Sequence, residues 1–420
     1  MKIVKVSLIL VAAVAAIVGL STASYAFHSG GVAECMGCHN IHDGQSSSAL
    51  LMAGDTTSTC ANASCHGAPS AGSYHILTPT VTPGVPPLNK TPGGDFGWLL
   101  KTYTWSPRSG TSETELGERH GHNVVAMDLP GYVVDSQNTT APGGDMAAAD
   151  LSCNSCHDNH GKLRRLSTGA VAITGAPIIG SGSYTNSAAP AAGQAVGVYR
   201  LLRGPGSTAG SGGKSFTALF NASVASTYNR AEASGSTPSQ TAIAYGAGVT
   251  DWCATCHPDM HSATSSKLTH PVNQGLSAGV VGNYNTYLGS GLTGDSGFDT
   301  IVPFQNDNTS DFAALKTAAI NNVATSAGAD ATTADRVNCL SCHRAHASGW
   351  SYMTRSNVTG NEFIAVDGVW PGTDSPSTIA TAAKYAQGRT VAETTAAYNG
   401  QPMKYSSYQR SLCNKCHAKD

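Results

Sequence analysis

The sequence predicts a mostly irregular, loop-rich fold with short α-helices and 3-10 turns and very little β-structure. Two observations predict it. The 420 residues include 47 glycines and 19 prolines, which interrupt regular elements. All twelve cysteines stand in six short motifs that end in histidine. We therefore expect one unit that is held together at these motifs rather than by a conventional layered core.

Each motif is a pair of cysteines followed at once by a histidine. The six are Cys35/Cys38/His39, Cys60/Cys65/His66, Cys153/Cys156/His157, Cys253/Cys256/His257, Cys339/Cys342/His343 and Cys413/Cys416/His417. The pattern C-x-x-C-H attaches c-type haem, because the two thiols form thioethers with the vinyl groups while the histidine binds the iron. We therefore expect six covalently bound haems c, and we expect the stack of porphyrins to be the core of the protein.

Other interpretations of the cysteines explain less. Six disulfides, zinc knuckles or thioredoxin-like pairs would not require a histidine directly after the second cysteine in every motif. The second motif departs from the pattern, since four residues separate Cys60 from Cys65. The extra residues can loop out while the two sulfur atoms keep their separation, and a local disulfide is the alternative.

The amino terminus predicts export. Two lysines precede an apolar run over Val6–Leu20, and Ser24-Tyr25-Ala26 fits the cleavage pattern of a signal peptide. We expect residues 1–26 to be removed and residues 27–420 to form a single hexahaem unit outside the cytoplasm. A retained membrane anchor is the alternative, but the apolar run is short and no basic residues follow it, so we expect no transmembrane anchor.

Local patterns place the few regular elements. Periodicity and alanine content predict short helices at Asp311–Val323, Ile379–Gln387 and Tyr408–Ala418. The glycine-rich stretch Gly204–Gly213 and the proline-rich stretch Thr78–Pro92 are expected to be loops or extended segments. The formal net charge of -2 leaves no basic stripe, which excludes nucleic acid as a partner, and a weakly charged surface tolerates self-association.

Nine histidines outside the motifs are available as second ligands for six irons. Four of them follow a motif closely: His42, His160 and His346 lie three residues beyond a motif histidine, and His261 lies four beyond His257. If these segments are helical, both histidines share one face. The later histidine cannot reach the opposite side of the same iron, because the macrocycle lies between, so it must serve another haem close by.

Ligation by two histidines fills both axial positions of an iron. It leaves no open site for a small substrate and favours electron transfer at low potential, although methionine stays an alternative ligand. A multihaem reductase would need an open iron, often marked by lysine in place of the motif histidine, and all six motifs end in histidine. The sequence therefore predicts an electron-transfer protein and no enzyme. Both a polymerising conduit and a monomeric periplasmic or outer-surface carrier are compatible with this.

Four segments resemble the OmcS-type outer-surface hexahaem cytochromes of metal-reducing bacteria. They are Phe27–Cys35, Thr91–Trp98, Asn338–Gly349 and Cys413–Asp420, and the resemblance runs from Phe27 to Asp420. It implies secretion to the outer cell surface and extracellular filaments with a continuous chain of haems. Other outer-surface cytochromes would be partners, and metal oxides or electrodes would be acceptors. The spacing in the second motif departs from the regular C-x-x-C-H of the family.

The resemblance also implies that His42 ligates the haem of His343 in the neighbouring subunit. The same offset would send His160 to the first haem and His346 to the third. His120 has no counterpart in the family, and we leave it out as a ligand. The candidate distal ligands are then His28, His42, His75, His122, His160, His261, His270 and His346.

Overall fold

The computed structural model describes residues 35–45, 49–68, 75–89, 91–107, 110–210, 212–225, 243–260, 272–286, 303–305, 309–321, 331–358, 369–376, 384–398, 413–414 and 416–417. The expected signal peptide lies outside these ranges. So do three candidate ligands, His28, His261 and His270. The same is true of most of the two helices predicted over Ile379–Gln387 and Tyr408–Ala418. Among the helices of the described ranges, none has the length and apolar character needed to cross a bilayer.

The described elements are short and widely separated. The α-helices are α2 (Cys35–Cys38), α3 (Thr56–Cys60), α4 (Cys153–Cys156), α5 (Val249–Ala254), α6 (Ala278–Thr286), α7 (Phe312–Asn321), α8 (Cys339–Cys342) and α10 (Val391–Ala397). Short 3-10 turns cover Phe96–Leu100, Gly117–His120, Ala148–Asp150, Tyr199–Leu201, Pro258–Met260 and Ser351–Met353. The loop-rich fold class is confirmed, and α7 confirms the helix predicted from Asp311 onward.

The helix predicted over Tyr408–Ala418 is wrong at its carboxyl end. Cys413 and Asn414 are helical, whereas Cys416 lies in a turn and His417 in a bend. The N–H groups of Cys416 and His417 both donate to the carbonyl of Cys413, at 3.0 and 2.9 Å. The two bonds close one turn at the second cysteine, as in the fourth motif, where the N–H groups of Cys256 and His257 both donate to the carbonyl of Cys253.

The helix predicted over Ile379–Gln387 is wrong at its carboxyl end, because Lys384 is helical but the residues after it are not. Residues 385–387 form a turn and a bend. Gln387 and Gly388 have φ angles of 48° and 78°, and this left-handed conformation ends a right-handed helix. Alanine content predicted helix here, but the backbone has already turned before α10 begins.

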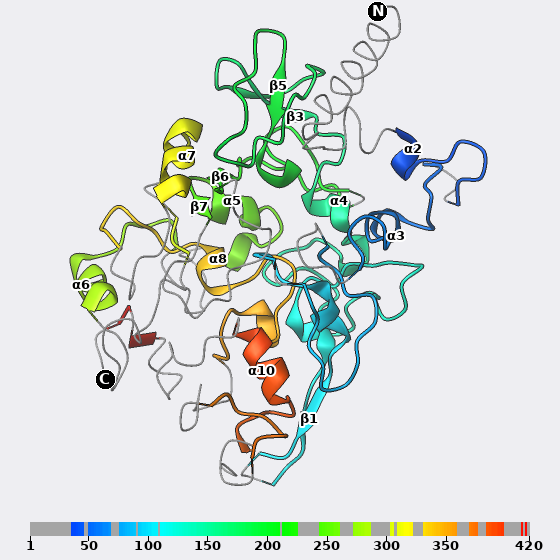
Figure 1. Ribbon diagram of the computed structural model, residues 1–420, viewed down its shortest axis with the longest axis vertical. Helices are drawn as coiled ribbons and strands as arrows, with labels where there is room; N and C mark the ends of the chain where they lie inside the picture. Colours follow the sequence, from blue (N-terminus) through cyan, green and yellow to red (C-terminus); the bar gives the residue numbers. More distant parts are fainter. Residues whose placement is uncertain are drawn as a thin grey trace, which may run out of the picture.

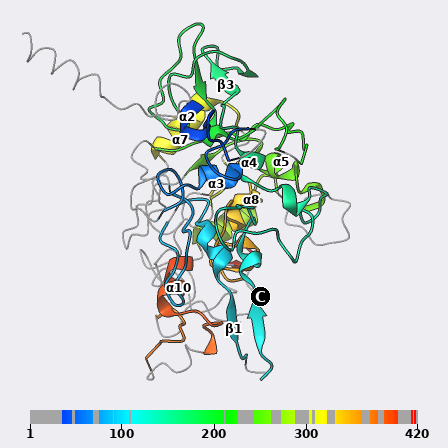
Figure 2. The ribbon, with the colours of Figure 1, turned by 90° about the vertical axis from the view of Figure 1, so that its right-hand side faces the viewer.

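Three small antiparallel sheets contain the described strands. The strands are β1 (Tyr103–Trp105), β2 (Glu113–Glu115), β3 (Leu163–Leu166), β4 (Val171–Ile173), β5 (Ala195–Gly197), β6 (Ala222–Ser223) and β7 (Ala244–Tyr245), paired as β1-β2, β4-β3-β5 and β6-β7. The β3–β5 sheet and the β1–β2 hairpin lie at opposite ends of the long axis (Figures 1 and 2). The motif helices lie between these two ends.

Three of the motif helices, α2, α4 and α8, are one turn long. In α4 and α8, residues at both ends stop the helix from extending further. The Ser155 and Ser341 hydroxyls accept hydrogen bonds from the backbone N–H groups of Ser152 and Asn338, at 3.1 Å in each case, which completes capping boxes on α4 and α8. Both helices end at the second cysteine, because the motif histidine that follows has extended backbone angles. Each of these histidines therefore leaves its helix and can pair with another segment.

The polypeptide contributes apolar clusters of its own. The largest surrounds Trp98, Trp350 and Trp370 and joins the loop before β1 to α10. It contains buried charges that are paired, including Lys101 with Glu393 at 2.7 Å. Composition alone did not predict these clusters, which supplement the expected haem core.

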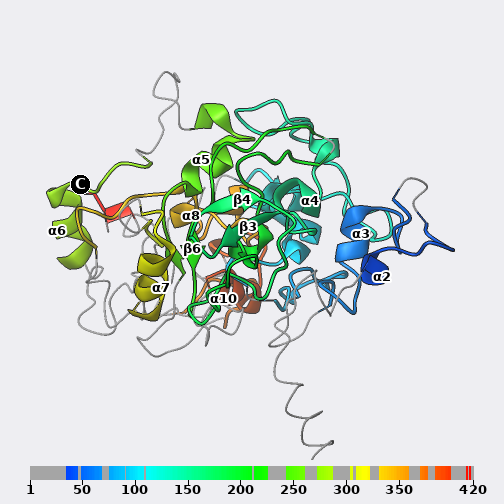
Figure 3. The ribbon, with the colours of Figure 1, turned by 90° about the horizontal axis from the view of Figure 1, so that it is seen from above.

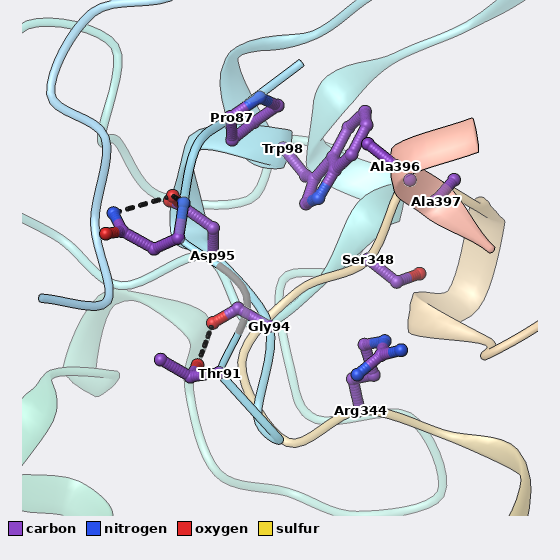
Figure 4. A pocket seen from close by; sticks show the side chains of 11 residues that line it. Pro87, Thr91, Gly94, Asp95, Trp98, Arg344, Ser348, Ala396 and Ala397 are labelled. Carbon is purple, nitrogen blue, oxygen red and sulfur yellow. Dashed lines mark hydrogen bonds between the residues drawn. The ribbon is translucent and has the colours of Figure 1, made fainter. Parts of the chain in front are cut away.

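A small pocket lies beside Trp98 of this apolar cluster. It is lined by the loop around Gly94 and Asp95, by Arg344 and Ser348, and by Ala397 of α10 (Figure 4). The fifth motif and the segment before β1 therefore approach each other closely here, which fixes the position of the chain that follows the fifth motif.

Candidate haem sites

The six motifs lie next to one another in the order of the chain. The thiol of Cys60 lies beside that of Cys153, and the thiol of Cys253 lies beside that of Cys339, which joins the second motif to the third and the fourth to the fifth. Electrostatic contacts join the remaining neighbours: Cys38 with Cys60 and Cys65, Cys156 with Cys256, and Cys342 with Cys413. The motif helices accordingly follow one another across the molecule, from α2 through α4 and α8 to the carboxyl end (Figures 1 and 3).

The wide second motif closes differently from the five regular ones, in which the N–H of the motif histidine donates to the carbonyl of the first cysteine. The carbonyl oxygen of Asn62 accepts hydrogen bonds from the backbone N–H groups of Cys65, His66 and Gly67, at 2.9 to 3.1 Å. The four intervening residues thus form a compact turn after α3. This turn is compatible with extra residues that loop out, and haem attachment at Cys60 and Cys65 stays a prediction.

The sixth motif is held against α6. Cys416 is half-buried and packs on the small apolar cluster of Leu276, Tyr284 and Ala331. Its carbonyl oxygen lies 3.4 Å from the side-chain amide of Asn283, which donates to it. His417 is exposed beside it. The structure thus places the last motif at the surface next to α6, and the roles of Cys416 as a thioether and of His417 as an iron ligand stay predictions.

Each of the first, third and fifth motifs pairs with a short segment, and the register is the same in all three. We call each segment a clasp. The clasps are residues 49–52 for the first motif, 200–203 for the third and 352–355 for the fifth. The central bridges are His39 with Leu51, His157 with Leu202 and His343 with Thr354. In every case the residue after the bridge donates its N–H to the carbonyl of the second cysteine, at 2.8 to 2.9 Å. The odd-numbered motifs therefore share one local structure.

Each clasp holds a residue in the left-handed region. Leu50, Leu201 and Met353 have φ angles of 49°, 52° and 49°. Non-glycine residues adopt this conformation at a cost of about 1 kcal/mol or more, so it persists only where the surroundings impose it. Its recurrence at equivalent positions indicates that pairing with the motif histidine imposes it.

The clasps also fix the orientation of the motif imidazoles. The Nδ1 atoms of His39, His157 and His343 lie 2.7, 2.9 and 2.8 Å from the carbonyl oxygens of the first clasp residues. In the fourth motif, the Nδ1 atom of His257 lies 2.8 Å from the carbonyl of Pro142. A carbonyl only accepts, so Nδ1 carries the proton and Nε2 keeps its lone pair for a metal.

Three motif histidines each face a second imidazole from another part of the chain. Ring centroids are 6.4 Å apart for His39 and His160, 6.5 Å for His157 and His346, and 6.0 Å for His257 and His122. Imidazole nitrogens lie about 2 Å from a bound metal, so two rings on opposite sides of one iron have centroids about 6 Å apart. The spacing of all three pairs fits an iron between them.

Two of the facing histidines, His346 and His122, are held neutral. Burial lowers the pKa of His346 to about 3, and the nearby His157 adds to the shift. Burial likewise lowers the pKa of His122 to about 4, with a further contribution from His257, and the Nδ1 atom of His122 lies 2.7 Å from the carbonyl of Ala345. A neutral ring with protonated Nδ1 presents Nε2 as a metal ligand.

The other candidates differ in their surroundings. His42 is exposed next to the first motif, and His75 is half-buried close to the second. His120 is fully buried, and both its nitrogens are engaged: Nδ1 lies 2.9 Å from the carbonyl of Trp98 and Nε2 lies 2.5 Å from Glu115. Its hydrogen bonds leave no lone pair for a metal.

The sequence argument about the later histidines changes in one respect. It assumed a helix through the motif and beyond, but His157 and His343 are extended, and a turn follows the first of them and a bend the second. The pairs His39/His160 and His157/His346 are nevertheless those that the offset predicts. The clasps and the pairing of His122 with His257 were not anticipated. The repeated Leu-Leu at 50–51 and 201–202 is the one sequence signal of a clasp.

Comparison with known proteins gives one curated relative and two solved structures. The C-type cytochrome OmcS of Geobacter sulfurreducens is 47% identical over 455 residues, and the match covers 100% of both chains. The cryo-EM structure of the OmcS nanowires has a TM-score of 0.75, and the outer membrane cytochrome S filament has a TM-score of 0.78, both from Geobacter sulfurreducens. Each is 43% identical and covers 94% of this chain and 100% of the solved chain. No family model matches the chain.

Proposed function

The chain belongs to the family of the C-type cytochrome OmcS, and from this premise we propose that it carries electrons along six closely packed haems and polymerises into extracellular conductive filaments. It is a c-type cytochrome that transfers electrons, not an enzyme. The six motifs and their order in space support the count of six haems and their arrangement in a row. The acceptors would be external, such as metal oxides, electrodes or other outer-surface cytochromes.

Paired imidazoles would hold the irons. His39 with His160 would hold the first haem, His157 with His346 the third, and His257 with His122 the fourth. The carbonyl groups of the clasps orient the motif imidazoles, and burial keeps His122 and His346 neutral. When bound, a haem iron with two histidine ligands supplies reversible one-electron chemistry at low potential.

His42 would serve the fifth haem of a neighbouring subunit. His160 faces the motif histidine two motifs earlier in the chain, and so does His346. His42 follows the first motif, and no motif lies two places before it in the same chain. Because His42 is exposed, it can reach a motif of another subunit. The clasped His343 would supply the other ligand of that iron.

The second and sixth irons complete the row. Their motif ligands would be His66 and His417, and the sixth haem would be attached through Cys413 and Cys416. The second ligands of these two irons would come from His28, His75, His261 and His270. The exposure of His417 supports a sixth haem at the surface, where it can meet the next subunit.

The location of the protein follows from the same family. Sec export through the periplasm, with cleavage after residue 26, would deliver the mature chain to the outer surface. Haem attachment to cysteine pairs belongs to this oxidising side of the membrane.

The facing pairs of histidines carry this proposal, and spectroscopy with mass spectrometry tests it. The mature protein should contain six haems, and the spectrum of the reduced protein should be low-spin and unchanged by carbon monoxide. A mass for five haems would assign Cys60 and Cys65 to a disulfide. A shift with carbon monoxide would favour a reductase, and single particles without filaments in electron micrographs would favour a monomeric carrier.

A further inference from the structure

Two clasps end in an arginine that binds its motif twice. The N–H groups of Arg203 and Arg355 donate to the carbonyls of Cys156 and Cys342, at 2.9 and 2.8 Å. Their side chains reach back into the same motifs: the Nε–H of Arg203 donates to the carbonyl of Asn154 at 2.6 Å, and that of Arg355 to the carbonyl of Leu340 at 2.7 Å. Each arginine therefore binds two of the carbonyls that a one-turn helix leaves unsatisfied.

The first clasp provides a natural contrast. Its equivalent residue is Met52, whose N–H donates to the carbonyl of Cys38 at 2.9 Å. The thioether side chain cannot donate a hydrogen bond, and 48% of Met52 is exposed. The backbone part of the clasp is thus common to the three odd-numbered motifs, whereas the guanidinium is present in only two of them.

We propose that Arg203 and Arg355 are positioning residues that lock the third and fifth motifs and place a positive charge beside the haems held there, which raises their reduction potentials above that of the first haem. This inference rests on the proposed function. Reduction adds an electron, so a nearby cation favours the reduced state. Arginine remains charged at any working pH, and both side chains are half-buried, where water screens their charges less than at the surface.

Neighbouring charges make the fifth motif the more positive of the two. Asp158, the residue after His157, interacts electrostatically with Arg203 and offsets part of its charge. The residue after His343 is instead the buried Arg344. The contrast with the first haem is therefore expected to be greater at the fifth haem than at the third.

Exchange of residues between the clasps tests the inference in both directions. We would titrate the reduced absorbance of intact filaments against potential for wild type, Arg203→Met, Arg355→Met and Met52→Arg, and count haems by mass spectrometry. Each arginine replacement should move about one-sixth of the absorbance to lower potential, and Met52→Arg should move about one-sixth to higher potential. Met52→Gln is the matched control, because it adds polarity without charge, and its titration should superimpose on that of wild type.

A further variant separates the positioning role from the charge. Arg355→Lys keeps a cation but lacks the Nε–H that binds Leu340, so it should preserve the potential and accelerate amide hydrogen exchange around α8. Unchanged titrations in Arg203→Met, Arg355→Met and Met52→Arg, with six haems in each, would overturn the inference. If the arginine variants failed to load haem, Met52→Arg would decide alone, since it removes no contact. Fewer than six haems in wild type would instead count against the proposed function.

Discussion

The imidazole of His160 is stacked against that of His39, with ring centroids 6.4 Å apart and ring planes 14° apart. The clasp fixes His39 through Nδ1, whereas His160 comes from the turn after the third motif. The site at the first motif is thereby completed by the segment that follows the third motif. His346 has the same relation to His157, so the chain repeats one connection at intervals of two motifs.

Replacement of His160 tests this connection inside one subunit. In His160→Ala the first iron should lose one imidazole and bind carbon monoxide, at about one haem in six. Six haems should still be attached, because the thioethers do not involve His160. Filaments should persist, since His42 is intact. Absorbance spectra of the reduced variant with carbon monoxide and electron micrographs would measure both effects, and the absence of carbon monoxide binding would exclude His160 as a ligand.

Replacement of His42 tests the same connection between subunits. His42→Ala should also bind carbon monoxide at about one haem in six, because the fifth iron loses a ligand. Unlike His160→Ala, it should form monomers or short oligomers and carry current poorly over long distances. The two variants are matched, since each removes one exposed histidine three residues after a motif. Filaments of normal length with wholly low-spin haem in His42→Ala would show that another histidine fills this position.

The second motif can be tested by removal of its cysteines. Cys60→Ala combined with Cys65→Ala should lower the haem count of the protein from six to five, because no thioether can form there. The control is Cys60→Ala alone, which should retain a haem attached through one thioether. Mass spectrometry under denaturing conditions measures both. An unchanged mass apart from the substitutions would show that the wild-type motif forms a disulfide and carries no haem.

The sequence predicted the fold class because glycine, proline and the cysteine motifs are local signals. α7 was predicted for the same reason, since its alanine-rich periodicity lies within one segment. The helix predicted through His417 was wrong, because the sixth motif closes into a turn at Cys416 and periodicity does not register such a turn. The clasps were not predicted, because each is a single bridge to a segment 11 to 45 residues after the motif histidine and no periodic pattern marks that segment. The apolar cluster around Trp98 joins distant segments, and its members show no common periodicity.

In the candidate sites, too, local signals were predicted and contacts between distant segments were mostly not. The motif cysteines and histidines could be identified from spacing alone, because haem attachment requires it. The offset argument anticipated which histidines face His39 and His157, whereas no spacing links His122 to His257. His120 has the residue type of a ligand, and only its buried hydrogen bonds distinguish it.

A buried carboxylate near β2 links stability to pH. Glu115 lies 2.5 Å from both the Nη2 atom of Arg389 and the Nε2 atom of His120, and all three side chains are buried. Burial opposes ionisation of Glu115, but the hydrogen bond with His120 and the charge of Arg389 outweigh it and lower the pKa to about 2. The guanidinium also lies over the rings of Tyr103 and Trp350, 4.1 and 4.6 Å from their centroids.

Glu115→Gln should therefore destabilise the protein by roughly 3 kcal/mol at neutral pH, because it leaves Arg389 buried without its carboxylate. The folded pKa lies below the unfolded value of about 4.5, so this stabilisation is complete above pH 4.5 and is lost as the pH falls towards 2. Thermal unfolding followed by circular dichroism across this range measures it. Glu113→Gln, exposed on the same strand, should change stability by less than about 0.5 kcal/mol. A difference between wild type and Glu115→Gln that stays constant down to pH 2 would contradict the coupling.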